Sequence, residues 1–352
     1  MKMWNSNFFK KTFKLSGKIW ILVLSVGLVS GGVIDHFAFL GNRGLESSIS
    51  RIRLDSPNFK FINPILAADT LDKKQFLKYR PLEKEISDYI KQTQASSQLE
   101  DAGVYYRDLT DGSWTGVNED EKFSPGSLQK VPLLIAYLKK AETEPGALDI
   151  KIVNKDPQDE NQAPGSEQSF KPSKIFQYNQ TATVRELLQL MVSYSDNNAT
   201  GALYDNIDHD ALKEVFSDLG IIYSDDKTHT DYLTPKQVSL FFRVLYNSSY
   251  LDWNSSEDAL SMLANSDFKE GIAAGLPADV PLAHKFGEGY APSDIENGKD
   301  IEELHDCGIV YYPKHPYFLC VMTKGYTDPE NLAKNIKAVS AIVYNDVNNR
   351  YK

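Results

Sequence analysis

Three short groups of residues in this sequence carry side chains that suit acyl transfer. The first is Ser127-Leu128-Gln129-Lys130, where the serine and the lysine share one face if a helix begins there. A lysine in that place accepts the serine proton when burial or nearby positive charge lowers its pKa. A serine at a helix N-terminus also lies where free N–H groups favour negative charge. This pair therefore predicts a nucleophilic serine with its own base.

Two further groups follow along the chain and carry side chains suited to the same chemistry. Ser195-Asp196-Asn197 comes directly after a segment with helical periodicity, and Lys285-Phe286-Gly287 ends a strand-like segment, ahead of Glu288. Taken singly, each group has an ordinary structural explanation: a cap serine with a surface lysine, a polar helix end, or an edge strand with a protective lysine. Their occurrence in this order, each in a fitting context, favours a catalytic site.

The ordered set resembles the signature of the penicillin-recognising serine enzymes, specifically the class A β-lactamases and the related DD-peptidases. The resemblance runs from about residue 75 to residue 352, and its flanks read FSPGSLQKVPLLIAYL, TATVRELLQLMVSYSDNNAT, GLPADVPLAHKFGEG and HDCGIVYYPKHPYFLCVMTKG. It implies a serine hydrolase or acyltransferase that is acylated by β-lactams or by D-Ala-D-Ala-type amides of peptidoglycan stem peptides. It implies no cofactor.

The resemblance also implies a role for each residue of the first two groups. Ser127 would be the acylated nucleophile, and Lys130 its general base or proton relay. Ser195 would pass a proton to the leaving nitrogen. Asn197 would hold Lys130 and the amide side chain of the substrate, while Asp196 would mainly tie the loop together.

The third group carries the substrate-facing roles. Lys285 would depress the pKa of Lys130 and attract the substrate carboxylate, and the backbone N–H groups of Ser127 and Glu288 would form the oxyanion hole. Together with Gly287, Phe286 belongs to the substrate-binding strand. Phe286 stands where class A enzymes have Thr or Ser, whose hydroxyl helps to bind that carboxylate. A ring in this place is expected to form an apolar wall instead.

A second departure concerns the group that hydrolyses the acyl-enzyme. Class A β-lactamases use a water held by a Glu in an E-x-x-L-N segment, but the corresponding residues 220–232, GIIYSDDKTHTDY, contain no glutamate. Asp225, Asp226 and Asp231 are the only acids there. We expect acylation to persist and deacylation to be slow. True β-lactamase activity, or a non-catalytic, membrane-tethered cell-wall-binding domain, are the alternatives.

The N-terminal end differs in charge from the rest of the 352-residue chain. Residues 1–40 hold five Lys and one Asp, a formal +4, whereas the remaining 312 residues hold 33 basic and 47 acidic side chains, a formal −14. The apolar residues 19–40 are enough to cross a bilayer, and the basic flank 1–18 would stay cytoplasmic. We expect a signal-anchor, a stem at 41–74 and an extracytoplasmic body in the bacterial cell envelope. A cleaved signal peptide is the alternative.

Composition excludes several classes of protein. Apolar residues make up 41% and charged residues 24%, as in globular proteins, and the net charge of −10 argues against a nucleic-acid partner. The 6 His show no metal-ligand spacing, so no metal is predicted. Cys307 and Cys320 flank the turn predicted at 313–316, with their midpoint at position 313.5, and either a disulfide or two small core residues fits. The oligomeric state is left open.

Hydrophobic periodicity and capping signals predict the fold class. Helices are expected at 74–94, at 127–141, after capping boxes at Thr183 and Thr234, after a cap at Asp210, and at 331–348. Strands are expected at 104–109, 114–117, 281–286, 308–312 and 317–323. This order predicts an α/β (α+β) domain at 75–352, of the β-lactamase/transpeptidase-like type. Its antiparallel five-stranded sheet is formed by both ends and flanked by helices, with an inserted all-helical subdomain at about 143–264.

Overall fold

An antiparallel five-stranded sheet organises the part of the chain that the structure describes. The computed structural model describes residues 52–53, 59–67, 77–96, 99–163, 168–223, 232–294 and 299–352. The strand order is β4-β3-β9-β8-β7. The strands are β3 (Asp101–Asp108), β4 (Trp114–Val117), β7 (Leu282–Asp294), β8 (Lys299–Val310) and β9 (Tyr317–Gly325). The structure thereby confirms the expected sheet formed by both ends of the domain.

The inner strands of the sheet are buried on both faces. Along β9, Leu319 and Val321 join one hydrophobic core, and Phe318 and Met322 join the other. This division follows from the alternation of side chains along a strand. Since neither face meets water, β9 can consist of an almost continuous apolar run, which is typical of a strand covered on both sides.

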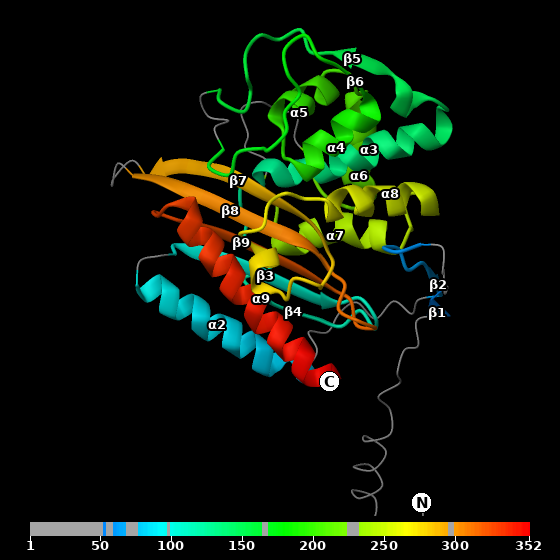
Figure 1. The fold of residues 1–352 in the computed structure, drawn as a ribbon. Helices are drawn as coiled ribbons and strands as arrows, with labels where there is room; N and C mark the ends of the chain where they lie inside the picture. The colour runs from blue at the N-terminus through cyan, green and yellow to red at the C-terminus, as the bar shows by residue number, and fades with distance from the viewer. Residues whose placement is uncertain are drawn as a thin grey trace, which may run out of the picture. The chain divides into compact units, whose positions relative to one another are not determined.

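Two helices from opposite ends of the domain cover one face of the sheet (Figure 1). They are α2 (Arg80–Ala95), preceded by the short helix η1 (Leu77–Tyr79), and α9 (Pro329–Tyr351). The buried residues of α9 recur at helical spacing and include Leu332, Ile336, Val339, Val343 and Val347. This apolar stripe fixes the helix on the sheet.

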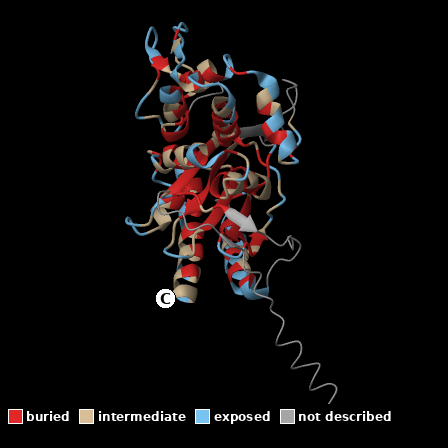
Figure 2. Cartoon of the chain, turned by 90° about the vertical axis from the view of Figure 1, so that its right-hand side faces the viewer, coloured by how far each residue is buried: buried red, intermediate tan, exposed pale blue. Residues whose placement is uncertain are grey.

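The segment between β4 and β7 supplies the helices on the other face, and its last short helix packs against α9. Its elements are η2 (Gly126–Gln129), α3 (Lys130–Thr143), η3 (Ala147–Asp149), β5 (Lys151–Val153), β6 (Thr181–Thr183), α4 (Val184–Ser193), α5 (Asn197–Tyr204), α6 (His209–Asp218), α7 (Pro235–Tyr246), α8 (Trp253–Ala264) and η4 (Ile272–Gly275). The two predicted capping boxes are confirmed, because Thr183 pairs with Glu186 and Thr234 pairs with Gln237. Figure 2 shows that buried residues concentrate inside the sheet and along the inner sides of these helices.

Two expectations about element boundaries were wrong. Asp208, and not Asp210, caps α6, because the Asp208 carboxylate accepts the backbone N–H of Asp210 at 3.0 Å. The strand predicted at 308–312 is the end of β8, which begins much earlier and runs through an acidic stretch. Pairing with β9, which extends to Glu302 opposite Gly325, holds this polar segment in the sheet against its local preference.

Part of the segment expected to be a stem packs against the body. Backbone N–H groups of residues 60–62 donate to the Glu257 carboxylate at 2.6, 2.7 and 2.9 Å, and Phe61 and Ile62 are buried in the core. The short strands β1 (Ile52–Arg53) and β2 (Ile65–Ala67) pair on either side of this contact. Within the described ranges, no helix combines the length and the apolar character needed to cross a membrane. The predicted membrane segment 19–40 lies outside those ranges.

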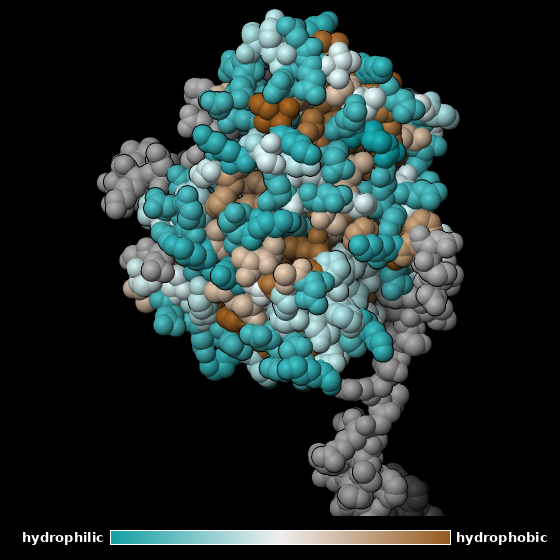
Figure 3. Space-filling view, in the orientation of Figure 1, coloured by the Kyte–Doolittle hydropathy of each residue, from teal (hydrophilic) through white to brown (hydrophobic). Residues whose placement is uncertain are grey.

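The surface shown in Figure 3 is mostly hydrophilic, with hydrophobic side chains in small separate patches. This distribution is usual for a folded domain whose large apolar side chains lie between helices and sheet. The buried charged side chains include Lys130, Asp196 and Lys285.

Cys307 on β8 and Cys320 on β9 form a disulfide. The two residues lie directly opposite each other in the register of these strands, and both are fully buried. The sequence fits either a disulfide or two small core residues, and the structure contains the disulfide. It closes the hairpin of β8 and β9, and β8 also pairs with β7, where Cys307 lies opposite Lys285.

We expect the double substitution Cys307→Ala with Cys320→Ala to lower the free energy of unfolding. For a sequence separation of 13 residues, loop-closure entropy gives a loss of about 3 kcal/mol. Chemical denaturation with and without reductant measures it. Reductant should destabilise the wild type and leave the double variant unchanged, and equal sensitivity of the two proteins would contradict a disulfide.

Candidate active site

Ser127 lies in a tight turn between the sheet and α3. It belongs to the 3-10 helix η2, and α3 begins at Lys130, so the α-helix starts three residues later than the sequence suggests. Side chains at i and i+3 eclipse in a 3-10 helix, so Ser127 and Lys130 still project from the same side.

Two glycines let the turn that carries Ser127 approach β7 at backbone distance. Gly126 has a positive φ of 49°, and a Cβ atom there would lie 1.9 Å from the carbonyl oxygen of Glu288. A Cβ atom at Gly287 would lie 2.5 Å from the carbonyl oxygen of Pro125. Larger residues would therefore separate the two segments. This contact brings the backbone of Glu288 beside the residue that precedes Ser127, as an oxyanion hole made from both segments requires.

The Lys130 side chain is buried and enters a dense hydrogen-bond network. Its Nζ atom donates to the Ser195 carbonyl oxygen at 2.8 Å, to Ser195 Oγ at 3.2 Å and to Asn197 Oδ1 at 2.8 Å. Burial lowers the pKa of Lys130 well below its ordinary value, and the positive charge of Lys285 lowers it further. A lysine with a lowered pKa becomes neutral, and so able to act as a general base, at a lower pH than an ordinary lysine.

Ser195 connects the nucleophile to both lysines. Its Oγ atom accepts hydrogen bonds from Lys130 Nζ at 3.2 Å and Lys285 Nζ at 3.0 Å, and donates to Ser127 Oγ at 3.2 Å. One donor and two acceptor sites are the full capacity of a hydroxyl group. Ser195 is fully buried and has a positive φ of 58°, an unfavourable backbone conformation for a residue with a side chain.

The loop that holds Ser195 is fastened by the next residue. The Asp196 carboxylate accepts from Asn161 Nδ2 at 2.7 Å, from Phe176 N at 2.8 Å, from Asn198 N at 3.2 Å and from Ala199 N at 3.1 Å. The last two bonds cap α5. Asp196 thus joins the start of α5 to the long segment between β5 and β6.

Asn161 is a site residue that sequence reasoning missed. Besides its bond to Asp196, its Oδ1 atom accepts the backbone N–H of Asn197 at 2.7 Å. Gln168 is another: its Nε2 atom donates to the Ser195 carbonyl oxygen at 3.0 Å. Both lie in the polar segment between β5 and β6. No local pattern there distinguishes these two side chains from the neighbouring polar residues.

Lys285 is fully buried at the other side of Ser195. Besides the bond to Ser195 Oγ, its Nζ atom donates to the Phe286 carbonyl oxygen at 2.9 Å and lies 4.1 Å from the centre of the Phe286 ring. Burial lowers the pKa of Lys285 to about 7, although the carboxylates of Asp306, Asp267 and Glu288 act in the opposite direction. Lys285 and Lys130 therefore share one buried, cationic region.

Phe286 and Glu288 follow Lys285 on β7. The Phe286 ring is buried and stacks on Phe268, with ring centres 4.2 Å apart. The Glu288 carboxylate accepts the backbone N–H groups of Ser169 at 3.2 Å and Phe170 at 3.5 Å. Burial raises the pKa of Glu288 to about 7, so its side chain changes charge near neutral pH. The sequence indicated only a backbone role for Glu288.

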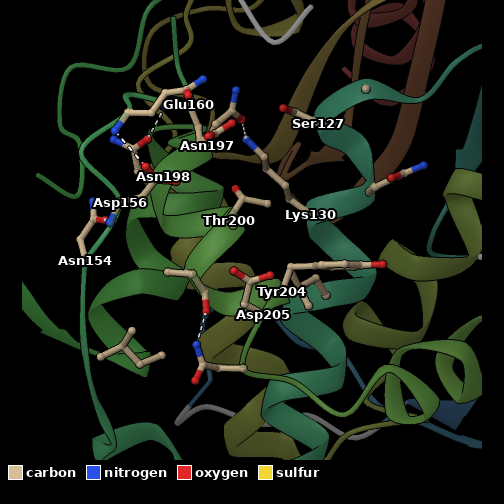
Figure 4. A pocket seen from close by; sticks show the side chains of 18 of the residues that line it. Ser127, Lys130, Asn154, Asp156, Glu160, Asn197, Asn198, Thr200, Tyr204 and Asp205 are labelled. Carbon is tan, nitrogen blue, oxygen red and sulfur yellow. Dashed lines mark hydrogen bonds between the residues drawn. The ribbon is translucent and has the colours of Figure 1, made fainter. Parts of the chain in front are cut away.

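A cavity of about 1030 Å³ opens from Ser127 along α5. In Figure 4, Ser127 and Lys130 lie on one side of it, and Glu160, Asn198 and Asp156 lie on the other. It continues past Thr200 toward Tyr204 and Asp205, and Gln168 and Glu288 line its end near Ser127. The cavity therefore has room for an extended substrate whose reacting carbonyl lies at Ser127.

His284 Nδ1 lies 2.7 Å from Asp306 Oδ1 and takes no part in the Ser127 network. Asp225, Asp226 and Asp231 lie outside the described residues. Among the described residues, no group of three or more His, Cys, Asp or Glu side chains is arranged to hold a metal ion.

Comparison with known proteins assigns this arrangement to a family. Residues 81–347 match the model of the β-lactamase enzyme family. A β-lactamase of Phocaeicola vulgatus is 27% identical over 185 residues, which cover 46% of this chain and 55% of that protein. The match thus spans little more than half of the length of that curated relative.

Solved structures share the fold at low identity. PBP-A, solved as a mutant in acyl-enzyme complex with penicillin G, is 23% identical with a TM-score of 0.59, over 76% of this chain and 97% of that chain. The class A β-lactamase of Mycobacterium abscessus is 22% identical with a TM-score of 0.61, over 76% and 99%. The extended-spectrum β-lactamase TLA-3 is 21% identical with a TM-score of 0.63, over 76% and 98%. The family model covers well over half of the sequence, and so the chain belongs to the β-lactamase enzyme family.

Proposed function

We propose that this chain is a β-lactamase-like serine hydrolase or acyltransferase that is acylated on Ser127 by β-lactams or by D-Ala-D-Ala-type amides of peptidoglycan stem peptides. Membership of the family indicates a serine hydrolase that acts on amide bonds. The observation that carries the proposal is the position of Ser195 Oγ, 3.2 Å from Ser127 Oγ and bonded to two buried lysines of lowered pKa. PBP-A, which shares the fold, was captured as a penicillin G acyl-enzyme.

The geometry supports a specific order of proton transfers. Ser127 Oγ attacks the substrate carbonyl carbon while its proton passes through the Ser195 hydroxyl to neutral Lys130. Negative charge on the carbonyl oxygen is stabilised by the backbone N–H groups of Ser127 and Glu288. The carbon–nitrogen bond then breaks, and the proton returns through Ser195 to the leaving nitrogen. An ester on Ser127 remains, which water or an amine resolves.

We expect the ester on Ser127 to resolve slowly. Residues 220–232 contain no glutamate to activate water, and loss of such a base slows a step by about 10²–10⁴-fold. This favours a cell-wall acyltransferase or DD-peptidase role over fast antibiotic hydrolysis. True β-lactamase activity is the second candidate, because the curated relative bears the name β-lactamase.

Incubation of the purified protein with penicillin G should add one penicilloyl group, detected by intact mass and located on Ser127 by peptide mapping. The adduct should persist after free penicillin is removed. The matched control Ser127→Ala should gain no mass, because it lacks the attacking oxygen. Thr200→Ala, on the wall of the same cavity and outside the lysine network, tests whether labelling depends on Ser127 itself.

The same time course separates the alternatives. Rapid return to the unmodified mass, with turnover of a chromogenic cephalosporin well beyond one equivalent, would establish a true β-lactamase and contradict slow deacylation. Absence of any adduct, together with muropeptide binding that survives Ser127→Ala, would favour the non-catalytic binding domain.

We expect the acylation rate to rise with pH well below the range of an ordinary lysine, whose pKa is about 10.4. A general base acts only when neutral, and the pKa of Lys130 is lowered by burial and by the charge of Lys285. Lys285→Gln removes that charge, so the pKa of Lys130 should rise. The ascending limb of the curve of acylation rate against pH should then move to higher pH. Acylation rates from pH 5 to 10 measure the shift.

Lys140→Gln provides the control for this experiment. Lys140 also lies on α3, but it is partly exposed and pairs with Glu144 at 3.6 Å. Removing its charge should leave the limb in place. A limb that does not move in Lys285→Gln, or that moves equally in both variants, would contradict electrostatic control of Lys130.

We further propose that residues 19–40 anchor the protein with its body outside the cytoplasm, since this apolar segment follows a basic flank. The full chain expressed in a bacterium should remain in the membrane fraction after alkaline carbonate extraction, with its body accessible to external protease in spheroplasts. A soluble protein whose N-terminus lies beyond residue 40 would instead indicate a cleaved signal peptide.

A further inference from the structure

A short segment contacts both the loop that holds Ser195 and the strand that carries Lys285. We name residues 168–173 the strap. At its start, Gln168 donates to the Ser195 carbonyl oxygen at 3.0 Å. At its end, Ser173 N and Oγ donate to Asp267 Oδ2 at 3.2 and 2.7 Å. The strap therefore runs from the loop that holds Ser195 to the segment that leads into β7.

The middle of the strap is fixed to β7 by polar and aromatic contacts. Backbone N–H groups of Ser169 and Phe170 donate to the Glu288 carboxylate at 3.2 and 3.5 Å. The Phe170 ring meets Phe268 edge-on at 5.0 Å and Phe286 at 6.4 Å. Three aromatic rings and one carboxylate thus occupy the space around the strand that carries Lys285.

Lys285 is enclosed behind these groups. It has 0% exposure, and its Nζ atom is bonded to Ser195 Oγ and to the Phe286 carbonyl oxygen, with the Phe286 ring 4.1 Å away. Gln168 and Glu288 are among the residues that line the cavity. A substrate at Ser127 therefore lies in a cavity that Gln168 and Glu288 help to form, whereas the Lys285 ammonium is enclosed.

A carboxylate on the substrate would be unfavourable beside Glu288. It would lose water without gaining an exposed cation, and it would approach the anionic form of Glu288, which repels it. A neutral group meets neither penalty. Specificity of this kind arises when a site disfavours one ligand as well as binding another.

We propose that Phe286 and Glu288 make this site prefer acyl donors without a carboxylate beside the scissile amide, such as an internal or amidated peptide bond, over the β-lactam and D-Ala-D-Ala-type donors that carry one. This inference rests on the proposed acylation of Ser127 and adds the class of donor. It assigns the Glu288 side chain a specificity role that is separate from the oxyanion role of its backbone N–H.

Penicillin G and its methyl ester provide an anionic and a neutral donor of nearly the same shape. The full chain in detergent is acylated with each, and rate constants for the Ser127 adduct are measured by intact mass. Each constant is divided by the alkaline hydrolysis rate of that compound, which removes differences in ring reactivity. We expect the corrected ratio of acid to ester to be below 1 in the wild type.

Glu288→Gln removes the charge and keeps the shape of the side chain, so the acid-to-ester ratio should rise about tenfold, equivalent to ~1.4 kcal/mol. Phe286→Thr should raise the ratio further, because it restores a hydroxyl and opens the way to Lys285. Phe286→Leu tests the loss of the ring alone if the threonine variant is unstable. Because the readout is a ratio, a general loss of rate in any variant does not affect it.

Glu160→Gln is the matched control. It removes a carboxylate from the opposite side of the cavity, where the backbone N–H of Glu160 donates to Asn198 Oδ1 at 2.7 Å. The ratio should not change in this variant. A wild-type ratio above 1, an unchanged ratio in Glu288→Gln, or an equal change in Glu160→Gln would overturn the inference while acylation itself stands. If neither donor modifies Ser127, the proposed function fails as well.

Discussion

Two buried lysines share one serine hydroxyl, and the rest of the site depends on that arrangement. Lys130 and Lys285 both donate to Ser195 Oγ, at 3.2 and 3.0 Å. Removing an ammonium group from water costs several kcal/mol even after the protein relaxes. Hydrogen bonds to the Ser195 and Phe286 carbonyl oxygens and to Asn197 Oδ1 offset part of this cost. The remainder appears as lowered pKa values, and a lysine with a lowered pKa is a usable base.

The fold supplies this arrangement from three distant parts of the chain. Lys130 comes from the start of α3, Ser195 from the turn between α4 and α5, and Lys285 from β7. The positive φ of Ser195 is maintained by its neighbour Asp196, whose carboxylate accepts four hydrogen bonds. Close contact at Gly126 holds the nucleophile turn against β7. Each lysine therefore has a fixed partner before any substrate binds.

The parts of the site that could be predicted from the sequence are those encoded by short spacing. Ser127 and Lys130 are three residues apart, and this spacing keeps them on one side in a 3-10 turn as well as in an α-helix. Capping boxes at Thr183 and Thr234 are local hydrogen-bond patterns, so the helices that they begin were also predictable. Short apolar runs bounded by turn residues made the strands of the sheet recognisable.

The remaining features depend on pairing between residues far apart in the sequence. Asn161 and Gln168 reach the site because a long polar segment folds back over it, and nothing in their neighbourhood marks them. The acidic part of β8 is a strand because β9 pairs with it, and its composition alone indicates otherwise. For the same reason, the contacts of the Glu288 side chain with Ser169 and Phe170 could not be predicted from the sequence.

Burial also separates two roles that the family resemblance assigns to Lys285. In that expectation, one ammonium group both depresses the pKa of Lys130 and attracts the carboxylate of the substrate. The first role acts through the interior, and enclosure strengthens it because charges interact more strongly away from water. The second requires an accessible ammonium, and the Phe286 ring occupies that side of Lys285 at 4.1 Å. Phe286 is thus compatible with the first role of Lys285, and its position is the basis of the donor preference that we propose.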